Sequence, residues 1–296
     1  MKKTVRLAKN AGFCFGVKRA INLAEEASSD HPEIVTLGPI IHNPQMVEHL
    51  RRKGISPVEE DDLPTDKPVI IRSHGITKEL RKRLEETSPS VIDATCPYVD
   101  NCMQHAKQLS KEGYPVIIYG NKDHPEVIAL KSYIAGESYI LSDEDRLPDK
   151  RFSKLAVISQ TTKSIEGFQK LIGKLIPSVK ELRVFNTICA ATSVRQSSSY
   201  NLAKESDLMI VIGGKNSSNT QMLFNICNNI VETLHIEEAE ELDCKILEEK
   251  SNIGLTAGAS TPDWIIVEVY NKIMKCFRDE EKLISKIKDI PGYKEE

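Results

Sequence analysis

Short apolar runs rich in β-branched residues alternate along this chain with longer segments in which apolar residues recur at helical spacing. The runs that predict strands are Ile34–Leu37, Val69–Ile71, Val91–Thr95, Val116–Tyr119, Leu155–Ile158, Val184–Ile188, Leu208–Ile212 and Asn252–Thr256. The segments that predict helices are Phe15–Ala27, Lys78–Glu86, Tyr98–Lys111, Ile165–Ile176, Ser193–Ser206 and Thr220–Asn229. Strands that alternate with helices are typical of parallel sheets, so we expect an α/β fold.

Three cysteines mark an internal repeat in this pattern. Cys14, Cys96 and Cys189 each end a short extended run and precede a helical segment. Self-similarity of this kind indicates that one structural unit occurs several times. We therefore predict three similar α/β units, which span residues 1–96, 97–189 and 190–296.

Two polar loops follow each of these cysteines. The residues 28 positions beyond the cysteines, all in polar loops after apolar runs, are His42, His124 and Ser217. The loops that come next in the three units carry His74, Thr161 and Ser260. Loops after parallel strands gather at one edge of a sheet, where open α/β sheets bind ligands. We expect the units to surround one central site with pseudo-threefold symmetry, and the charged segment from Phe277 to form a tail or closing arm.

The composition is that of an ordinary globular protein, since 40% of the 296 residues are hydrophobic and 28% are charged. Forty basic and 43 acidic residues give a net charge of -3, and no basic block could neutralise a run of phosphates, so we expect no nucleic-acid partner. No stretch approaches the ~20 apolar residues that span a bilayer. Because Arg6, Lys9 and Asn10 interrupt the apolar run of a secretory signal, we predict a cytoplasmic protein without membrane contact.

Seven cysteines in a chain of this kind do not predict a disulfide framework. At the start of a helix, free N–H groups and the helix dipole favour the thiolate, so Cys14, Cys96 and Cys189 are candidate metal ligands. The other reading of each is a small buried residue, and the repeated position argues against it. The cysteines without such support, which we expect in the core, are Cys102, Cys227, Cys244 and Cys276.

The ligand set decides which metal group these thiolates suit. A structural zinc site needs a fourth protein ligand, and the repeat supplies none. Three thiolates suit a cubane iron–sulfur cluster whose fourth iron is open to substrate, and such an iron combines Lewis acidity with electron transfer.

The polar loops predict an anion-binding pocket, because hydroxyl, amide and imidazole donors follow glycine-containing turns at helix starts. Its candidate residues are His42, His74, His124, Thr161, Ser217, Ser218, Asn219 and Ser260. A helix cap is the competing reading for each serine or asparagine, since capping and anion binding use the same free donors. For the remaining histidines we favour structural positions; these are His31, His49, His105 and His235.

Several motifs in these loops together resemble the family of 4-hydroxy-3-methylbut-2-enyl diphosphate reductases. The segments that carry the resemblance, in order along the chain, are Ala11–Arg19, Asp93–Pro97, Gly120–Glu126, Ser159–Thr162, Lys215–Asn219 and Thr256–Ser260. The resemblance extends from residue 11 to about residue 263.

The resemblance implies the last step of the non-mevalonate isoprenoid pathway. The hydroxylated allylic diphosphate would be reductively dehydroxylated to isopentenyl and dimethylallyl diphosphates, with two electrons and two protons consumed and water released. It implies a [4Fe–4S] cluster on Cys14, Cys96 and Cys189, a proton from Glu126, and a ferredoxin or flavodoxin as electron donor. Thr161 would lie near the substrate hydroxyl, and the residues that would hold the diphosphate are His42, His74, His124, Ser217, Ser218, Asn219 and Ser260.

Two other functions fit the same residues. A redox-neutral dehydratase would use an open-iron cluster only as a Lewis acid. A sensor without enzyme activity would hold the cluster and bind a phosphorylated signal in the polar pocket. Turnover that requires a low-potential electron donor distinguishes the reductase from both.

Overall fold

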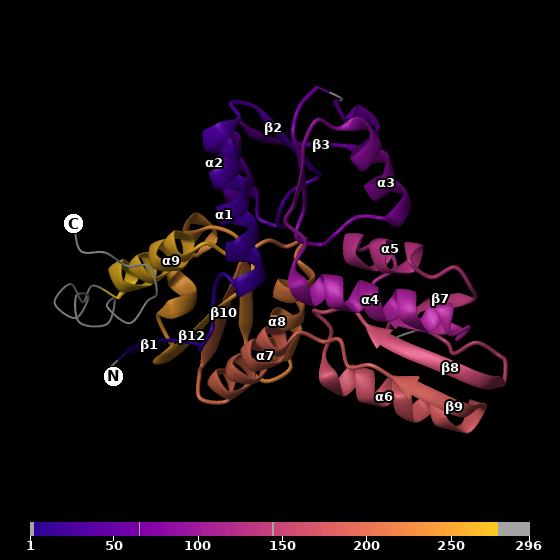
Figure 1. Ribbon diagram of the computed structural model, residues 1–296. Helices are drawn as coiled ribbons and strands as arrows, with labels where there is room; N and C mark the ends of the chain where they lie inside the picture. The colour runs from indigo at the N-terminus through magenta and orange to yellow at the C-terminus, as the bar shows by residue number, and fades with distance from the viewer. Residues whose placement is uncertain (1–2, 65, 144, 278–296) are drawn as a thin grey trace. The chain divides into compact units, whose positions relative to one another are not determined.

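The computed structural model describes residues 3–277 apart from residues 65 and 144. In this part of the chain three four-stranded sheets alternate with helices (Figure 1), and all the strand pairs are parallel. The predicted α/β fold is therefore confirmed. The predicted tail lies outside the described residues, except for Phe277, which follows α9 (Asp263–Cys276).

The first sheet has the strand order β3 (Ile55–Val58), β2 (Ile34–Leu37), β4 (Val69–Ile71) and β5 (Val91–Asp93). Its helices are α1 (Phe15–Asp30), α2 (Pro44–Arg51) and α3 (Lys78–Thr87), with a 3-10 turn at Glu60–Asp62. Leu80 and Leu84 of α3 pack on the face that Val35 and Ile71 present. Figure 1 shows α1 and α3 on opposite sides of this sheet.

The second sheet has the order β7 (Ser138–Leu141), β6 (Val116–Tyr119), β8 (Phe152–Ser159) and β9 (Val179–Val184). Helices α4 (Pro97–Lys111) and α5 (Pro125–Ser132) cover the face with Val116 and Ile118. Helix α6 (Ile165–Leu175), which continues into a 3-10 turn at Ile176–Ser178, covers the face with Ile117 and Tyr119. β6 is continuously apolar because both of its faces are buried.

The third sheet has the order β11 (Thr233–Ile236), β10 (Leu208–Ile212), β12 (Asn252–Ala257) and β1 (Thr4–Leu7). Helices α7 (Ala190–Ala203) and α8 (Ser218–Asn228) cover Met209 and Val211, and α9 covers Leu208 and Ile210. Two 3-10 turns, Ala239–Glu241 and Cys244–Leu247, lie between β11 and β12.

All three sheets have one topology, with β1, β5 and β9 in the same edge position. The third sheet takes this strand, β1, from the beginning of the chain, whereas its other three strands come from the last part of the chain. The chain forms two compact units: one holds the residues up to Cys14, His42–Met46 and those from Ala191 onward, and the other holds Phe15–Ile41 and Val47–Ala190. The boundaries 1–96, 97–189 and 190–296 and the pseudo-threefold arrangement stay predictions.

One predicted strand is displaced in the structure. Residues 185–188 of the predicted run Val184–Ile188 lie beyond β9, which begins earlier, at Val179. This edge strand exposes Lys180 and Glu181, so its sequence lacks the continuous apolar signal of a central strand. Phe185 still donates its N–H to the carbonyl of Val157, 3.0 Å away, before the chain turns toward Cys189.

The expectation that Cys244 and Cys276 are separate core residues is wrong. They form a disulfide, with Cα atoms 5.5 Å apart and a separation of 32 positions along the chain. Cys276 ends α9 and Cys244 begins the second of the 3-10 turns that pack against this helix. Tertiary packing brings the two together, so their spacing in the sequence gave no indication of the pair. Cys102 and Cys227 are fully buried in the core, as expected.

Within the described residues, we find no helix that combines the length and apolar character needed to cross a membrane. The predicted cytoplasmic location stays a prediction.

Candidate active site

Each repeat cysteine is tied to the polar loop beside it by one backbone hydrogen bond. In each sheet the cysteine follows the edge strand, and its N–H donates to a carbonyl in the loop after the neighbouring central strand. The bonds are Cys14 to Ala259 at 3.2 Å, Cys96 to Ser73 at 3.0 Å and Cys189 to Thr161 at 3.0 Å. The repeat seen in the sequence therefore corresponds to a repeated contact in the structure.

The three repeat cysteines differ from the core cysteines in their surroundings. Cys14, Cys96 and Cys189 are half-buried, and each directly precedes a helix, α1, α4 or α7. Burial raises the pKa of the Cys102 thiol to about 12, and also raises the pKa of the Cys227 thiol to about 12. These two thiols stay protonated at neutral pH and are poor metal ligands. The repeat cysteines remain the proposed ligands.

The positions 28 residues beyond the cysteines mark helix starts. His124 caps α5, because its Nδ1 accepts the N–H of Glu126 at 3.1 Å. Ser217 caps α8 through a 3.4 Å bond from the N–H of Thr220. His42 precedes Asn43, whose Oδ1 accepts a bond from the N–H of Met46 at the start of α2. The capping role considered for the serines therefore holds for Ser217.

Glu126 is a buried carboxyl in the second residue of α5, with 1% of its surface exposed. Its Oε1 accepts the backbone N–H of Thr161 at 2.7 Å, and its Oε2 lies 2.9 Å from the Thr161 hydroxyl. Thr161 also accepts the hydrogen bond that holds Cys189. One threonine therefore connects the buried acid to a proposed cluster ligand.

Burial raises the pKa of Glu126 from its ordinary 4.5 to about 7, and the two hydrogen bonds from Thr161 offset part of this rise. A pKa near 7 lets the group hold a proton and release it at neutral pH, as a general acid requires. In the protonated form, Oε2 can donate to the Thr161 oxygen, which frees the threonine proton for another acceptor.

We expect Glu126 to make the protein less stable as the pH rises from about 5 to 8. Between its unfolded pKa near 4.5 and its folded pKa near 7, the folded state holds a proton that the unfolded state has lost, so stability falls through this window. Urea unfolding at several pH values measures the free energy of unfolding. Across this window it should fall by about 2–3 kcal/mol more in wild type than in Glu126→Gln. The control is Glu166→Gln, which removes an exposed carboxylate at the same position of α6. The same dependence of the free energy of unfolding on pH in wild type and Glu126→Gln would contradict the assignment.

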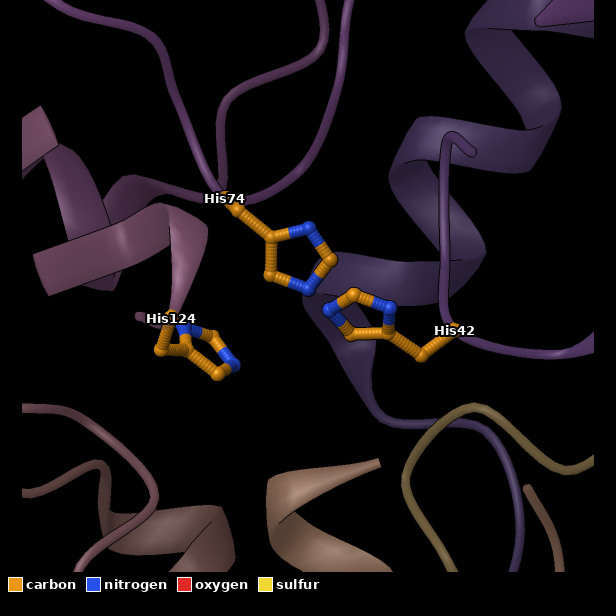
Figure 2. Close-up of side chains that lie close together, drawn as sticks. All are labelled: His42, His74 and His124. Carbon is orange, nitrogen blue, oxygen red and sulfur yellow. The ribbon is translucent and has the colours of Figure 1, made fainter. Parts of the chain in front are cut away.

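His74 and His124 lie edge to face, with ring centroids 5.5 Å apart and planes at 82° (Figure 2). They come from the loops after β4 and before α5. Because Nδ1 of His124 accepts the N–H of Glu126, the proton of the neutral ring is on Nε2, which can donate to an anion. The structure therefore brings two of the predicted pocket residues together, beside Glu126.

The loops of the third sheet gather further predicted residues. The Ser260 hydroxyl donates to the backbone carbonyl of His42 at 3.1 Å, so these two residues are adjacent. Asn219 is 4% exposed, and neither its amide nitrogen nor its amide oxygen has a hydrogen-bond partner among the described residues. Buried amides without partners are rare, and each costs free energy unless a ligand completes it. Asn219 therefore fits a ligand-binding position.

The sequence profile of the family described as LytB protein matches residues 5–274. The chain belongs to the LytB family. It is 46% identical over 275 residues to 4-hydroxy-3-methylbut-2-enyl diphosphate reductase of Campylobacter concisus, and 45% identical over 274 residues to that of Nitratiruptor. These alignments cover 92% of this chain and 99% and 98% of the relatives.

Solved structures agree with this LytB assignment. The fold matches a structure of (E)-4-hydroxy-3-methyl-but-2-enyl diphosphate reductase, the terminal enzyme of the non-mevalonate pathway, with 43% identity and a TM-score of 0.69 over 92% of this chain and 99% of the other. It matches the Plasmodium falciparum E-1-hydroxy-2-methyl-but-2-enyl-4-diphosphate reductase with 29% identity and a TM-score of 0.84 over 93% and 89%. The predicted reductase of this pathway is confirmed, and the dehydratase and sensor readings are set aside.

Sequence reasoning missed Gln160 as a residue that shapes the site. Its side-chain oxygen accepts the N–H of Asn121 at 3.0 Å, and its side chain packs against Gly120, where a Cβ would meet it at 3.2 Å. Gln160 thereby joins the loop of His124 to the loop of Thr161. Its place in the Ser159–Thr162 motif was the available signal.

Proposed function

We propose that this LytB protein reductively dehydroxylates (E)-4-hydroxy-3-methylbut-2-enyl diphosphate to isopentenyl and dimethylallyl diphosphates. The observation that carries the proposal is the buried Glu126 bound to Thr161, which also holds Cys189. This contact puts a proton source next to a proposed electron-transfer group. The reaction breaks the allylic C–O bond and forms a C–H bond, consuming two electrons and two protons and releasing one water.

The proposed cofactor is a [4Fe–4S] cluster on Cys14, Cys96 and Cys189. These residues fit such a group because they are thiols at helix starts, half-buried and repeated in one backbone setting. When bound, the cluster supplies electrons and an open coordination position for the substrate oxygen. Ferredoxin or flavodoxin is the proposed electron donor.

Proton delivery is the part that the chain's own residues perform. Protonated Glu126 donates from Oε2 to the Thr161 oxygen, and the Thr161 hydroxyl donates to the substrate oxygen, so that the leaving group departs as water rather than hydroxide. The surroundings that raise the pKa of Glu126 also exclude bulk water from this transfer.

Diphosphate binding is assigned to hydroxyl, amide and histidine donors from the loops of all three sheets. The proposed residues are His42, His74, His124, Ser217, Ser218, Asn219 and Ser260. Helix starts are favourable places for phosphate groups because their N–H donors are free and the dipole attracts negative charge. The buried amide of Asn219 at the start of α8 supports this role most directly.

Anaerobic reconstitution with iron and sulfide, followed by an assay with this substrate and a low-potential reductant, tests the function. We expect iron and sulfide in the stoichiometry of one [4Fe–4S] cluster and turnover that requires the reductant. An apoprotein that binds zinc alone and converts the substrate as fast as the iron-loaded protein would overturn the proposal.

Asn219→Ala is expected to weaken substrate binding about 10-fold to 150-fold, because a hydrogen bond to a charged group contributes about 1.5–3 kcal/mol. Isothermal titration of the iron-loaded protein with the diphosphate measures the effect. Asn225→Ala removes an exposed asparagine from the same helix and is the matched control. Equal affinity in Asn219→Ala and wild type would remove Asn219 from the pocket.

A further inference from the structure

Two exposed aromatic side chains lie just beyond proposed cluster ligands. Phe15 directly follows Cys14 and is 65% exposed, more than any other large apolar side chain of the described residues. Tyr98 comes two residues after Cys96 and is 46% exposed. Two residues of chain span at most about 7 Å, so both aromatic residues lie close to a ligand cysteine. Single exposed apolar residues are normal on a protein surface, but two in this setting need an explanation.

The two aromatic residues belong to neighbouring helix starts in the same compact unit. Phe15 is the first residue of α1, and Tyr98 is the second residue of α4. Arg19, one turn after Phe15, donates from Nη1 to the carbonyl of Thr95 at 3.1 Å, just before α4 begins. This bond holds the start of α1 beside the start of α4 (Figure 1). We call the first two turns of α1 and the first turn of α4 the α1/α4 surface, which comprises residues 15–22 and 97–100.

The α1/α4 surface carries more positive than negative charge. The helix dipole favours acidic side chains at a helix start, yet α1 has none in its first turn and places Lys18 and Arg19 at its fourth and fifth positions. In the described part of the chain neither cation is paired with a carboxylate, since Arg19 bonds to backbone carbonyls and the nearby Asp93 pairs with Arg81. Asp100 is the one carboxylate of this surface. Because the whole chain has a net charge of -3, this positive charge is a local feature.

We propose that the α1/α4 surface is the docking site of an acidic protein electron carrier that reduces the iron–sulfur site. The inference rests on the proposed function, because it requires a cluster on Cys14, Cys96 and Cys189. Each docking event transfers one electron from the reduced carrier, which is thereby oxidised, to the cluster. Two such events supply the two electrons that one turnover consumes.

Three properties of the α1/α4 surface suit such a carrier. Electron transfer slows steeply with distance, and this surface lies next to two of the proposed ligands. Cations attract an acidic carrier and raise the rate of productive encounters. Exposed aromatic rings supply contact area at the centre of an interface, where charged residues are few. Together they match a small, transient interface of the kind that electron-transfer partners form.

Calorimetric titration of the anaerobically reconstituted protein with a purified acidic [2Fe–2S] ferredoxin tests the docking site. The variants are Phe15→Ser, Tyr98→Ser and Lys18→Glu, which all change exposed side chains. Truncating an aromatic anchor of an interface weakens binding about 5-fold or more, and we expect this loss in the two serine variants. Lys18→Glu reverses a charge, so it should bind ferredoxin more weakly than wild type and depend less on added salt.

Steady-state kinetics separate docking from the chemical step. With reduced ferredoxin as the donor, all three variants should show a raised KM for ferredoxin. With reduced methyl viologen, a small molecule that does not need the α1/α4 surface, they should turn over like wild type. The matched controls are Ile176→Ser, an exposed apolar residue just after α6, and Lys170→Glu, an exposed lysine on α6. Both controls should bind ferredoxin like wild type.

Several results would overturn the proposal. Wild-type affinity for ferredoxin in all three variants would do so, as would equal losses of affinity in the variants and the controls. If the serine variants lose iron, Lys18→Glu at full iron content decides: weaker binding supports the docking site, and wild-type binding contradicts it. A wild-type dimer in gel filtration that Phe15→Ser converts to a monomer would assign the surface to a second copy of the chain instead. Failure of the proposed function is seen separately, as a wild-type protein without a cluster or without turnover on methyl viologen.

Discussion

Replacing Glu126 with Gln is expected to lower the turnover number about 10²-fold to 10⁴-fold, which is the usual contribution of a positioned general acid. Gln keeps the size of the side chain. Its oxygen can still accept the N–H of Thr161, and its amide can donate to the Thr161 hydroxyl. The proton that reaches the substrate oxygen is lost, while the surroundings of the diphosphate stay intact, so affinity should change little.

Steady-state kinetics at saturating substrate and reductant measure this effect, and titration of substrate into the iron-loaded protein measures binding. Glu166→Gln removes a carboxylate from the same position of α6, where it is exposed, and should turn over like wild type. A wild-type turnover number in Glu126→Gln, with the chemical step shown to limit the rate, would assign the proton to another group. If the proton does not pass through the Thr161 hydroxyl either, Thr161→Val, which lacks a hydroxyl, should be as active as Thr161→Ser, which keeps one.

Exchanging any one of Cys14, Cys96 and Cys189 for Ser is expected to abolish turnover, since a cluster held by three thiolates has no spare protein ligand. Iron and sulfide analysis of the anaerobically reconstituted variants should show loss of the cluster, while circular dichroism reports the fold. The controls are Cys102→Ala and Cys227→Ala, which remove buried thiols with pKa values of about 12. A folded Cys102→Ala variant that loses as much iron as Cys96→Ser would contradict the ligand assignment.

The central strands could be predicted from sequence because both of their faces are buried. Val116–Tyr119 and Leu208–Ile212 are continuous apolar runs, and the structure gives both the predicted bounds. The outer strands β3, β7 and β11 have at most two buried residues each. Each has only four residues, with polar residues among the apolar ones, and sequence analysis did not identify them.

Two short helices, the longer helix α9 and the distant contacts were also not predicted. Helices α2 and α5 have eight residues each and begin at a proline, so neither contains enough turns to establish helical periodicity. The loop position of Thr161 was predicted, but Glu126, expected in a loop, is the second residue of α5. Their contact joins residues 35 positions apart, and only the pairing of β6 with β8 brings them together. The same holds for the disulfide partners Cys244 and Cys276.

The edge position of β1 has a consequence for biosynthesis. Thr4 of β1 pairs with Asn252 of β12, and 248 residues separate them. At about 5–20 residues per second, the ribosome needs about 12–50 s to make the intervening chain. The first strand to leave the ribosome is therefore nearly the last to find its neighbour, and Ala259 can hold Cys14 only after that. The backbone setting that the three repeat cysteines share is therefore complete only after residue 259 has been synthesised.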